Sequence, residues 1–153
     1  MKHNTIAKTF TAAAATILAL AMGPSAQAQN KGCSAGMLRG TFAYTSIGAI
    51  TAPPELAGPF GEIGTQYFDG TGGTTGSATL STNGSINQVT VTGTYTVNAD
   101  CTGTMTLLIQ EFQATVHVTF VIANGGDEFQ AIETETGFVI TRLGHRLFPG
   151  KAI

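Results

Sequence analysis

From residue 40 onward, hydrophobic and polar residues alternate in steps of two, and glycine-rich turns interrupt the alternation roughly every 10 to 15 residues. The clearest stretch is residues 89–97, in which valines and Tyr95 alternate with threonines. A period of two is that of a β-strand with one buried face. The pattern therefore predicts strands with an apolar inner face and an outer face that carries hydroxyl groups.

A tight hairpin is predicted just before this stretch. Asn83 and Gly84 are the residue types that adopt the positive φ angles of a two-residue hairpin turn. Pairing Thr82 with Ser85 places the apolar residues before the turn beside the valines after it. The register set by the turn thus agrees with the hydrophobic pattern.

The alternation predicts eight strands in all. They are residues 41–47, 62–68, a segment that carries Ala78 and Leu80, and residues 89–97, 104–109, 115–122, 127–135 and 138–146. Sequential antiparallel strands with short turns favour an all-β, eight-stranded, up-and-down β-barrel, because pairing the last strand with the first removes both unpaired edges. A two-sheet β-sandwich is the alternative, since alternation alone does not establish closure. The predicted inward side chains are Phe42, Tyr44, Phe68, Leu80, Val91, Tyr95, Leu107, Val118, Phe120, Phe129 and Ile140.

One connection is long in this interpretation, residues 48–61. Its adjacent Pro53 and Pro54 are incompatible with a strand interior. Long loops in compact domains often cover a binding site, and Leu56 with Phe60 could close one end of the barrel as a lid. The alternative is ordinary packing of this loop over the barrel end.

Residues 1–28 have the composition of a secretory signal peptide. Lys2 and Lys8 give a positive start, an apolar run covers residues 10–22, and small residues lead up to Ala28, after which we expect cleavage. The run is shorter than the roughly 20 residues of a membrane-spanning helix. We therefore expect a secreted or periplasmic protein with no membrane span, made of an N-terminal segment at residues 29–40 and a barrel domain at residues 41–148.

Charge and cysteine content narrow the function classes. From residue 29 onward five Lys and Arg face nine Asp and Glu, a net charge of −4, which disfavours a nucleic-acid partner. Cys33 and Cys101 are the only cysteines. Because exported proteins meet an oxidising environment, we expect these two to form a disulfide that tethers the N-terminal segment to the barrel.

Glu133 is the residue that fits the barrel pattern least well. It shares the inward parity of Phe129, and a two-residue turn after it would place Ala131 opposite Arg142, with Glu133 diagonal to that arginine. A carboxylate in an apolar interior has a raised pKa unless it is paired. We expect Glu133 and Arg142 to form a polar anchor in a cavity. A longer loop at Asn124 that reverses the parity, or a wet barrel rim, are the alternatives.

Three further residues are candidate ligand contacts. Tyr44 and Tyr95 point inward in the prediction, where their hydroxyls could bind a ligand or satisfy the backbone, and Phe60 belongs to the candidate lid. His117 and His145 lack a third metal ligand, so no metal site and no cofactor are expected.

A family resemblance adds to this picture. The segments Phe68-Asp69-Gly70, Asn83-Gly84, 93–97 and 100–104, the last with its Asp-Cys-Thr-Gly run, resemble those of small exported bacterial proteins. The strand layout of that group, over about residues 33–146, is similar to the allene oxide cyclase and dirigent-like β-barrels. Plant allene oxide cyclases hold an unstable epoxide in an apolar barrel, but the likeness to them is one of strand layout, and it carries no functional residue of those proteins onto this chain.

The sequence favours a secreted β-barrel that binds a small, mostly apolar ligand. One alternative is a barrel cyclase or isomerase that acts by confinement, with Glu133 as its acid or base, although no catalytic motif is recognisable. The other alternative is a non-catalytic envelope or matrix protein that uses its threonine-covered outer surface for interactions. A barrel interior without a cavity would favour this last hypothesis.

Overall fold

The structure is a computed structural model that describes residues 32–148. The predicted signal peptide and its cleavage site lie outside the described residues. Eight strands and two short 3-10 helices make up the fold. The strands are β1 (Gly40–Ile50), β2 (Gly58–Phe68), β3 (Gly73–Thr82), β4 (Ser85–Val97), β5 (Thr102–Ile109), β6 (Ala114–Ala123), β7 (Glu128–Glu133) and β8 (Phe138–Arg146), and the helices are η1 (Ala35–Leu38) and η2 (Asn124–Gly126).

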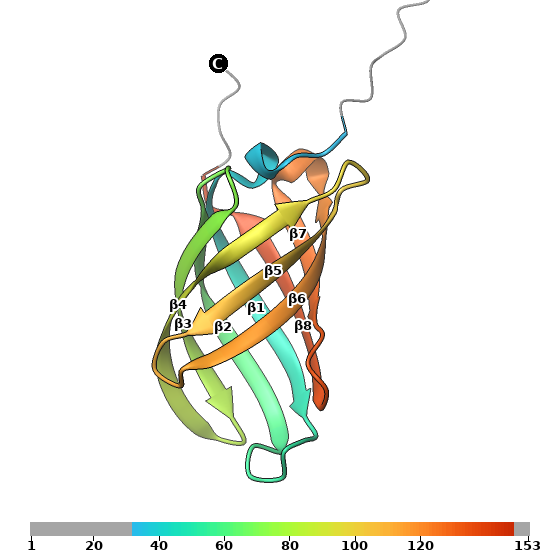
Figure 1. The fold of residues 1–153 in the computed structure, drawn as a ribbon. Coiled ribbons are helices and arrows are strands. Elements are labelled where there is room, and N and C mark those ends of the chain that lie inside the picture. The colour runs from blue at the N-terminus through green and yellow to red at the C-terminus, as the bar shows by residue number, and fades with distance from the viewer. Residues whose placement is uncertain (1–31, 149–153) are drawn as a thin grey trace, which may run out of the picture. The chain divides into compact units, whose positions relative to one another are not determined.

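The strands form a closed antiparallel barrel in which each strand pairs with the next and β8 pairs with β1 (Figure 1). The predicted up-and-down barrel is confirmed, and the sandwich alternative is excluded. The predicted hairpin register is also confirmed, because Thr82 pairs with Ser85 and the buried Ala78 pairs with the buried Val89. No helix in the described part of the chain is long and apolar enough to cross a membrane.

The two faces of the barrel wall follow the predicted alternation. Every residue of the predicted inward set is buried, with exposed fractions from 0% to 7%. The threonines that alternate with them lie on the outer face, where Thr90, Thr94 and Thr96 are exposed. Burial of the apolar face supplies the main driving force for this fold.

The prediction of a long loop over residues 48–61 is wrong. β1 continues to Ile50 and β2 begins at Gly58, so only residues 51–57 connect them. Gly48 pairs with Phe60 on one side and with Ile140 of β8 on the other. A Cβ atom on Gly48 would overlap the carbonyl oxygen of Val139. This glycine therefore permits a close approach of two strands, whereas in the sequence it resembles a turn residue.

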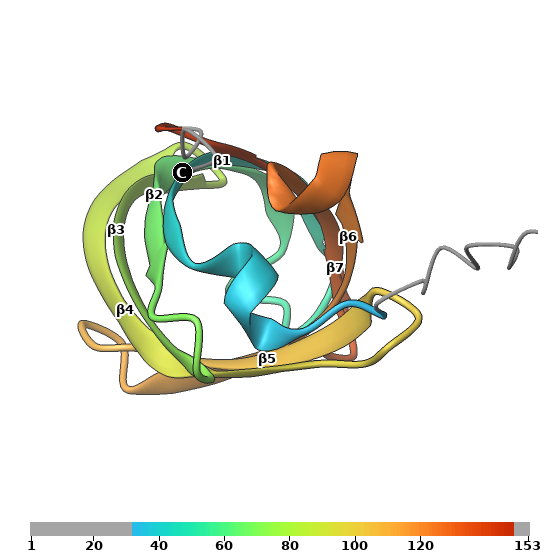
Figure 2. The same cartoon turned by 90° about the horizontal axis from the view of Figure 1, so that it is seen from above.

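One end of the barrel is closed by the segment that precedes β1. Figure 2 shows η1 lying across the opening, and its Leu38 is completely buried. Beneath it Phe42, Phe68 and Phe129 pack against one another, with ring centroids 5.4 to 5.7 Å apart. The predicted disulfide between Cys33 and Cys101 is present and ties this segment to the β4–β5 turn, with 4.9 Å between the Cα atoms.

The opposite end is formed by residues 51–57 and the turns after β3, β5 and β7, at the bottom of Figure 1. No helix of the described chain lies across this end. The barrel therefore has a plugged end and an open end, and we use these two terms below.

Candidate functional site

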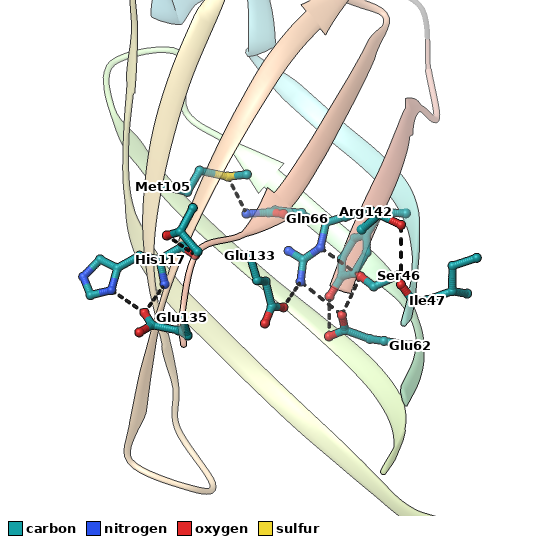
Figure 3. Close-up of polar contacts among 12 residues, drawn as sticks. Ser46, Ile47, Glu62, Gln66, Met105, His117, Glu133, Glu135 and Arg142 are labelled. Atoms are coloured by element: carbon teal, nitrogen blue, oxygen red, sulfur yellow. Dashed lines mark hydrogen bonds and ion pairs between the residues drawn. The ribbon is translucent and has the colours of Figure 1, made fainter. Parts of the chain in front are cut away.

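Five polar side chains gather inside the barrel toward its open end. Tyr44 and Ser46 come from β1, Glu62 from β2, Glu133 from β7 and Arg142 from β8, and all are at most 9% exposed. Ser46 pairs with Glu62 on one side and with Arg142 on the other, so three neighbouring strands bring these residues into one row. We call these five residues the polar cluster. Figure 3 labels four of them, with Ser46 between Glu62 and Arg142.

Within the polar cluster, both carboxylate oxygens of Glu62 accept hydrogen bonds from other members. It accepts hydrogen bonds from the Tyr44 hydroxyl at 3.0 Å, the Ser46 hydroxyl at 2.8 Å and Arg142 Nη2 at 3.1 Å. Arg142 Nε donates to the Ser46 hydroxyl at 3.0 Å. A buried charge pair persists only when its remaining donors and acceptors are satisfied in this way. The guanidinium also lies 4.3 Å from the centre of the Tyr44 ring, at a cation–π distance.

The phenol of Tyr44 stays protonated as part of this arrangement. Burial raises its pKa well above the ordinary value of 10.0, and the neighbouring Glu62 carboxylate raises it further, while Arg142 opposes both effects. A neutral hydroxyl is the state that can donate to Glu62. Tyr44 therefore serves as a fixed donor within the polar cluster.

Glu133 is placed differently from Glu62. Its nearest carboxylate oxygen lies 3.9 Å from Arg142 Nη2, and its carboxyl group makes no hydrogen bond to any residue that the structure describes. Burial raises the pKa of Glu133 from 4.5 to about 7, and Arg142 only partly offsets this effect. The carboxyl group is thus buried, close to a cation, and without a hydrogen-bonding partner in the described chain.

Two adjoining cavities lie between the polar cluster and the open end. A space of about 50 Å³ is bounded by Glu62, Glu133 and Arg142 together with apolar side chains. It shares five lining residues with a larger cavity of about 510 Å³ at the barrel mouth, which we call the mouth cavity. The shared residues are Phe60, Leu80, Ile109, Val116 and Phe138. A mostly apolar pocket with a few converging polar groups is the usual form of a small-molecule site.

The predicted site residues divide between the two ends of the barrel. Tyr44, Glu133 and Arg142 lie together in the polar cluster, and Phe60 lines both cavities. Tyr95 is not among them. Its hydroxyl donates to the Ala35 carbonyl at 3.0 Å and accepts from the Gly70 N–H at 3.1 Å at the plugged end, which is the backbone alternative considered for it.

Both alternatives for the placement of Glu133 are excluded. The turn at η2 keeps the predicted parity, because Phe129 and Glu133 are both buried. Ala131 pairs with Arg142 as predicted. Glu133 is 9% exposed, so it does not lie on a wet rim.

The sequence interpretation missed Glu62 and Ser46. A signal for each was present, since Glu62 has the same parity as Phe68 in β2 and Ser46 the same parity as Phe42 in β1. Glu62 stood at the first position of the predicted strand, where burial is not expected. The extension of β2 to Gly58 places it well inside the barrel.

Leu56 from the candidate lid lines the mouth cavity and is 44% exposed. Phe60, its predicted partner, belongs to β2 and not to the loop. The shorter loop of residues 51–57 thus contributes to the edge of the mouth cavity. Closure by this loop stays a prediction.

The two other features considered lie on the outer surface and lack buried ionisable side chains. A hollow of about 800 Å³ on the outer surface contains one charged residue, Glu111, whose carboxylate already accepts from the Thr90 N–H. His117 faces outward and pairs with Glu135. Within residues 32–148 no three His, Cys, Asp or Glu side chains are grouped as a metal site would require.

Comparisons with known proteins support the fold. No protein-family model matches the chain, and a search of curated proteins gave no match. Among solved structures, the chain is similar to a redesigned β-barrel, with 16% sequence identity, a TM-score of 0.55, and coverage of 74% of this chain and 95% of that one. It is also similar to the redesigned β-barrel mFAP1 bound to DFHBI, with 18% identity, a TM-score of 0.52, and coverage of 73% and 97%. At these identities the matches show the barrel fold alone, and the resemblance to allene oxide cyclase and dirigent-like barrels stays a prediction.

Proposed function

We propose that this barrel binds a small, mostly apolar molecule through its open end, with the polar cluster as the anchor for one polar group of that molecule. The observation that carries the proposal is the mouth cavity of about 510 Å³, whose apolar walls lead inward to buried ionisable side chains. Apolar walls favour binding by removing hydrocarbon surface from water. The similar barrel mFAP1, which was solved with the small molecule DFHBI, supports the capacity of this architecture for such a ligand.

The division of the barrel interior also supports the proposal. The plugged end is filled by aromatic rings that contact one another, whereas the open end keeps space beside half-buried Phe60 and Phe138. A protein selected only for stability gains from filling such a space, because cavities lower the free energy of unfolding. The envelope or matrix alternative depended on an interior without a cavity, so the mouth cavity does not favour it.

A titration with a neutral apolar probe tests the proposal. Purified protein is titrated with 2-naphthylmethanol by calorimetry, using wild type and two matched tryptophan variants. Ala114 lines the mouth cavity, whereas the next residue, Thr115, faces solvent on the same strand. Ala114→Trp should weaken binding by about tenfold or more because the indole fills the cavity, and Thr115→Trp should bind as wild type does.

Equal affinity of the two tryptophan variants would contradict binding in this cavity. Native mass spectrometry of protein purified from its own host complements the titration by looking for a small molecule that co-purifies. Wild-type protein that neither binds the probe nor carries a small molecule would contradict the proposed function.

A barrel cyclase or isomerase is the second candidate function. The observation that favours it is Glu133, whose pKa of about 7 suits a group that donates or accepts a proton near neutral pH. This candidate predicts turnover of a bound substrate, a pH profile that follows Glu133, and loss of activity in Glu133→Gln. Binding without turnover would separate the carrier from the enzyme.

The location outside the cytoplasm belongs to the same proposal. The Cys33–Cys101 disulfide supports it, since disulfides form and persist in oxidising compartments. Mass spectrometry of the exported protein should find an N-terminus at Gln29, whereas an intact Met1 would contradict the predicted cleavage.

A further inference from the structure

The charges around the two cavities are unbalanced. Among the described residues that line them, Glu55, Glu62 and Glu133 are carboxyls and Arg142 is the single cation. Arg142 and Glu62 neutralise each other through a direct hydrogen bond and the shared Ser46 hydroxyl. Above about pH 7, where Glu133 is ionised, the negative charge that this pair does not balance belongs to Glu133.

Glu133 is also the group that lines the inner space with only a long ion pair to Arg142, at 3.9 Å, and with no hydrogen-bond donor among the described residues. Its side chain is more than nine-tenths buried and lines the cavity of about 50 Å³, and no described residue donates a hydrogen bond to it. Figure 3 shows its carboxylate beside Arg142, on the side away from Glu62. A buried carboxylate without donors is unfavourable, so a ligand that brings a donor gains the interaction that the protein lacks.

The size of the inner space limits the group that can enter. A space of about 50 Å³ has room for a few water-sized groups, so it admits a small head group and not the whole body of an apolar ligand. Phe60 and Phe138 line the same space, and aromatic rings beside a carboxylate form a favourable environment for an organic cation. The mouth cavity, about ten times larger, takes the apolar body.

From this geometry we propose that the ligand is an apolar primary amine, whose ammonium group pairs with Glu133 in the inner space while its hydrocarbon part fills the mouth cavity. The inference rests on the proposed function and narrows it to one ligand class. An anionic ligand is disfavoured, because Glu62 and Glu133 both line the inner space and the one cation there is already paired. A neutral ligand would fill the same cavities without compensating the charge of Glu133.

The test uses three probes of one shape, 2-naphthylmethylamine, 2-naphthylmethanol and 2-naphthoate, titrated calorimetrically at pH 8. Wild-type protein should bind the amine at least about tenfold more tightly than the alcohol, and the carboxylate most weakly, because a charge-assisted hydrogen bond forms only with the amine. Glu133→Gln should abolish the preference for the amine, so that this variant binds the amine and the alcohol with affinities that agree within about threefold.

Glu135→Gln is the matched control. This substitution removes a carboxylate two residues away, on the outer surface where Glu135 pairs with His117. Glu135→Gln should prefer the amine over the alcohol by the same factor as wild type does. Circular dichroism and the unfolding midpoint establish that each variant is folded, and the comparison of three probes on wild-type protein needs no variant at all.

The pH dependence gives a second readout. The ionisable groups around Glu133 are Arg142 from β8, Glu62 from β2, Tyr44 from β1 and the more distant Glu135, and Glu133 itself has a pKa of about 7 in the empty site. The affinity for the amine should therefore fall by up to about tenfold per pH unit below pH 7, as Glu133 takes up a proton. The affinity for the alcohol should change much less.

The outcomes separate the two proposals. If none of the three probes binds, this inference is overturned, and if protein purified from its own host also carries no small molecule, the proposed function is overturned with it. If the alcohol or the carboxylate binds as tightly as the amine, or if Glu133→Gln keeps the preference for the amine, the barrel is a ligand-binding protein but the assignment of an amine is wrong. Preference for the amine that disappears in Glu133→Gln and persists in Glu135→Gln supports both.

Discussion

At the scale of single residues, Glu62 and Glu133 differ in how the barrel compensates their charge. Glu62 accepts three side-chain hydrogen bonds, whereas Glu133 lies 3.9 Å from the nearest guanidinium nitrogen. Because the raised pKa of Glu133 reflects burial in the folded state, it makes the stability of the protein depend on pH.

Glu133 should destabilise the empty barrel when it ionises. Between about pH 4.5 and about pH 7 the folded state holds a proton that the unfolded state has lost, so the free energy of unfolding falls as the pH rises. Glu133→Gln should remove this slope and be the more stable protein at pH 8, by at most about 3 kcal/mol. Urea unfolding of both proteins from pH 5 to pH 8 measures the effect, and parallel stability curves would contradict it.

Arg142 should be the most sensitive position of the polar cluster. Arg142→Met leaves the buried Glu62 without its cation, which should lower the free energy of unfolding by about 3–5 kcal/mol at pH 8. Tyr44→Phe removes only one hydrogen bond to Glu62 and should lower it by about 1 kcal/mol. Chemical denaturation of the two variants gives the comparison. Similar losses in the free energy of unfolding would mean that the Glu62–Arg142 ion pair stabilises the fold no more than a single hydrogen bond does.

At the scale of elements, glycine positions decide how closely the strands approach. In β1, Gly48 faces the backbone of β8, whereas at Gly61 in β2 a Cβ atom would have no heavy atom within 4 Å. Neither glycine has a positive φ, so close approach alone distinguishes the two sites.

The pair Gly48→Ala and Gly61→Ala tests this difference. The added methyl at Gly48 must push β1 away from Val139, so the free energy of unfolding should fall by about 1–3 kcal/mol. Gly61→Ala should change it by less than about 0.5 kcal/mol. Thermal or urea unfolding provides the measurement, and equal effects would show that the strands adjust to the methyl group.

At the scale of the whole molecule, the packed aromatic core and the proposed binding cavity lie at opposite ends of one barrel. The plugged end holds η1, the disulfide and the packed aromatic rings, and the open end holds the mouth cavity above the polar cluster. Because the disulfide and the packed rings stabilise the fold at the plugged end, the barrel can tolerate an unfilled cavity at the open end.

Removing the disulfide should therefore affect stability but not binding. The bond joins residues 68 positions apart, and in the chain-entropy model its loss costs about 4 kcal/mol. The double variant Cys33→Ser, Cys101→Ser should show this loss in urea unfolding while its folded form binds 2-naphthylmethanol as wild type does. A large change in affinity would mean that the two ends are coupled.

The eight strands, their inward residues and the pairing of Ala131 with Arg142 followed from the sequence, because the period of two and the turn residues are local properties of the chain. The membership of Glu62 and Ser46 in the polar cluster, the continuation of β1 to Ile50, and the position of Tyr95 at the plugged end required the tertiary structure. These features depend on which residues of different strands come to the same position along the barrel axis when the sheet closes. The axial position of each residue is set by the registers of all eight strand pairs together. It therefore cannot be read from any single segment of the sequence.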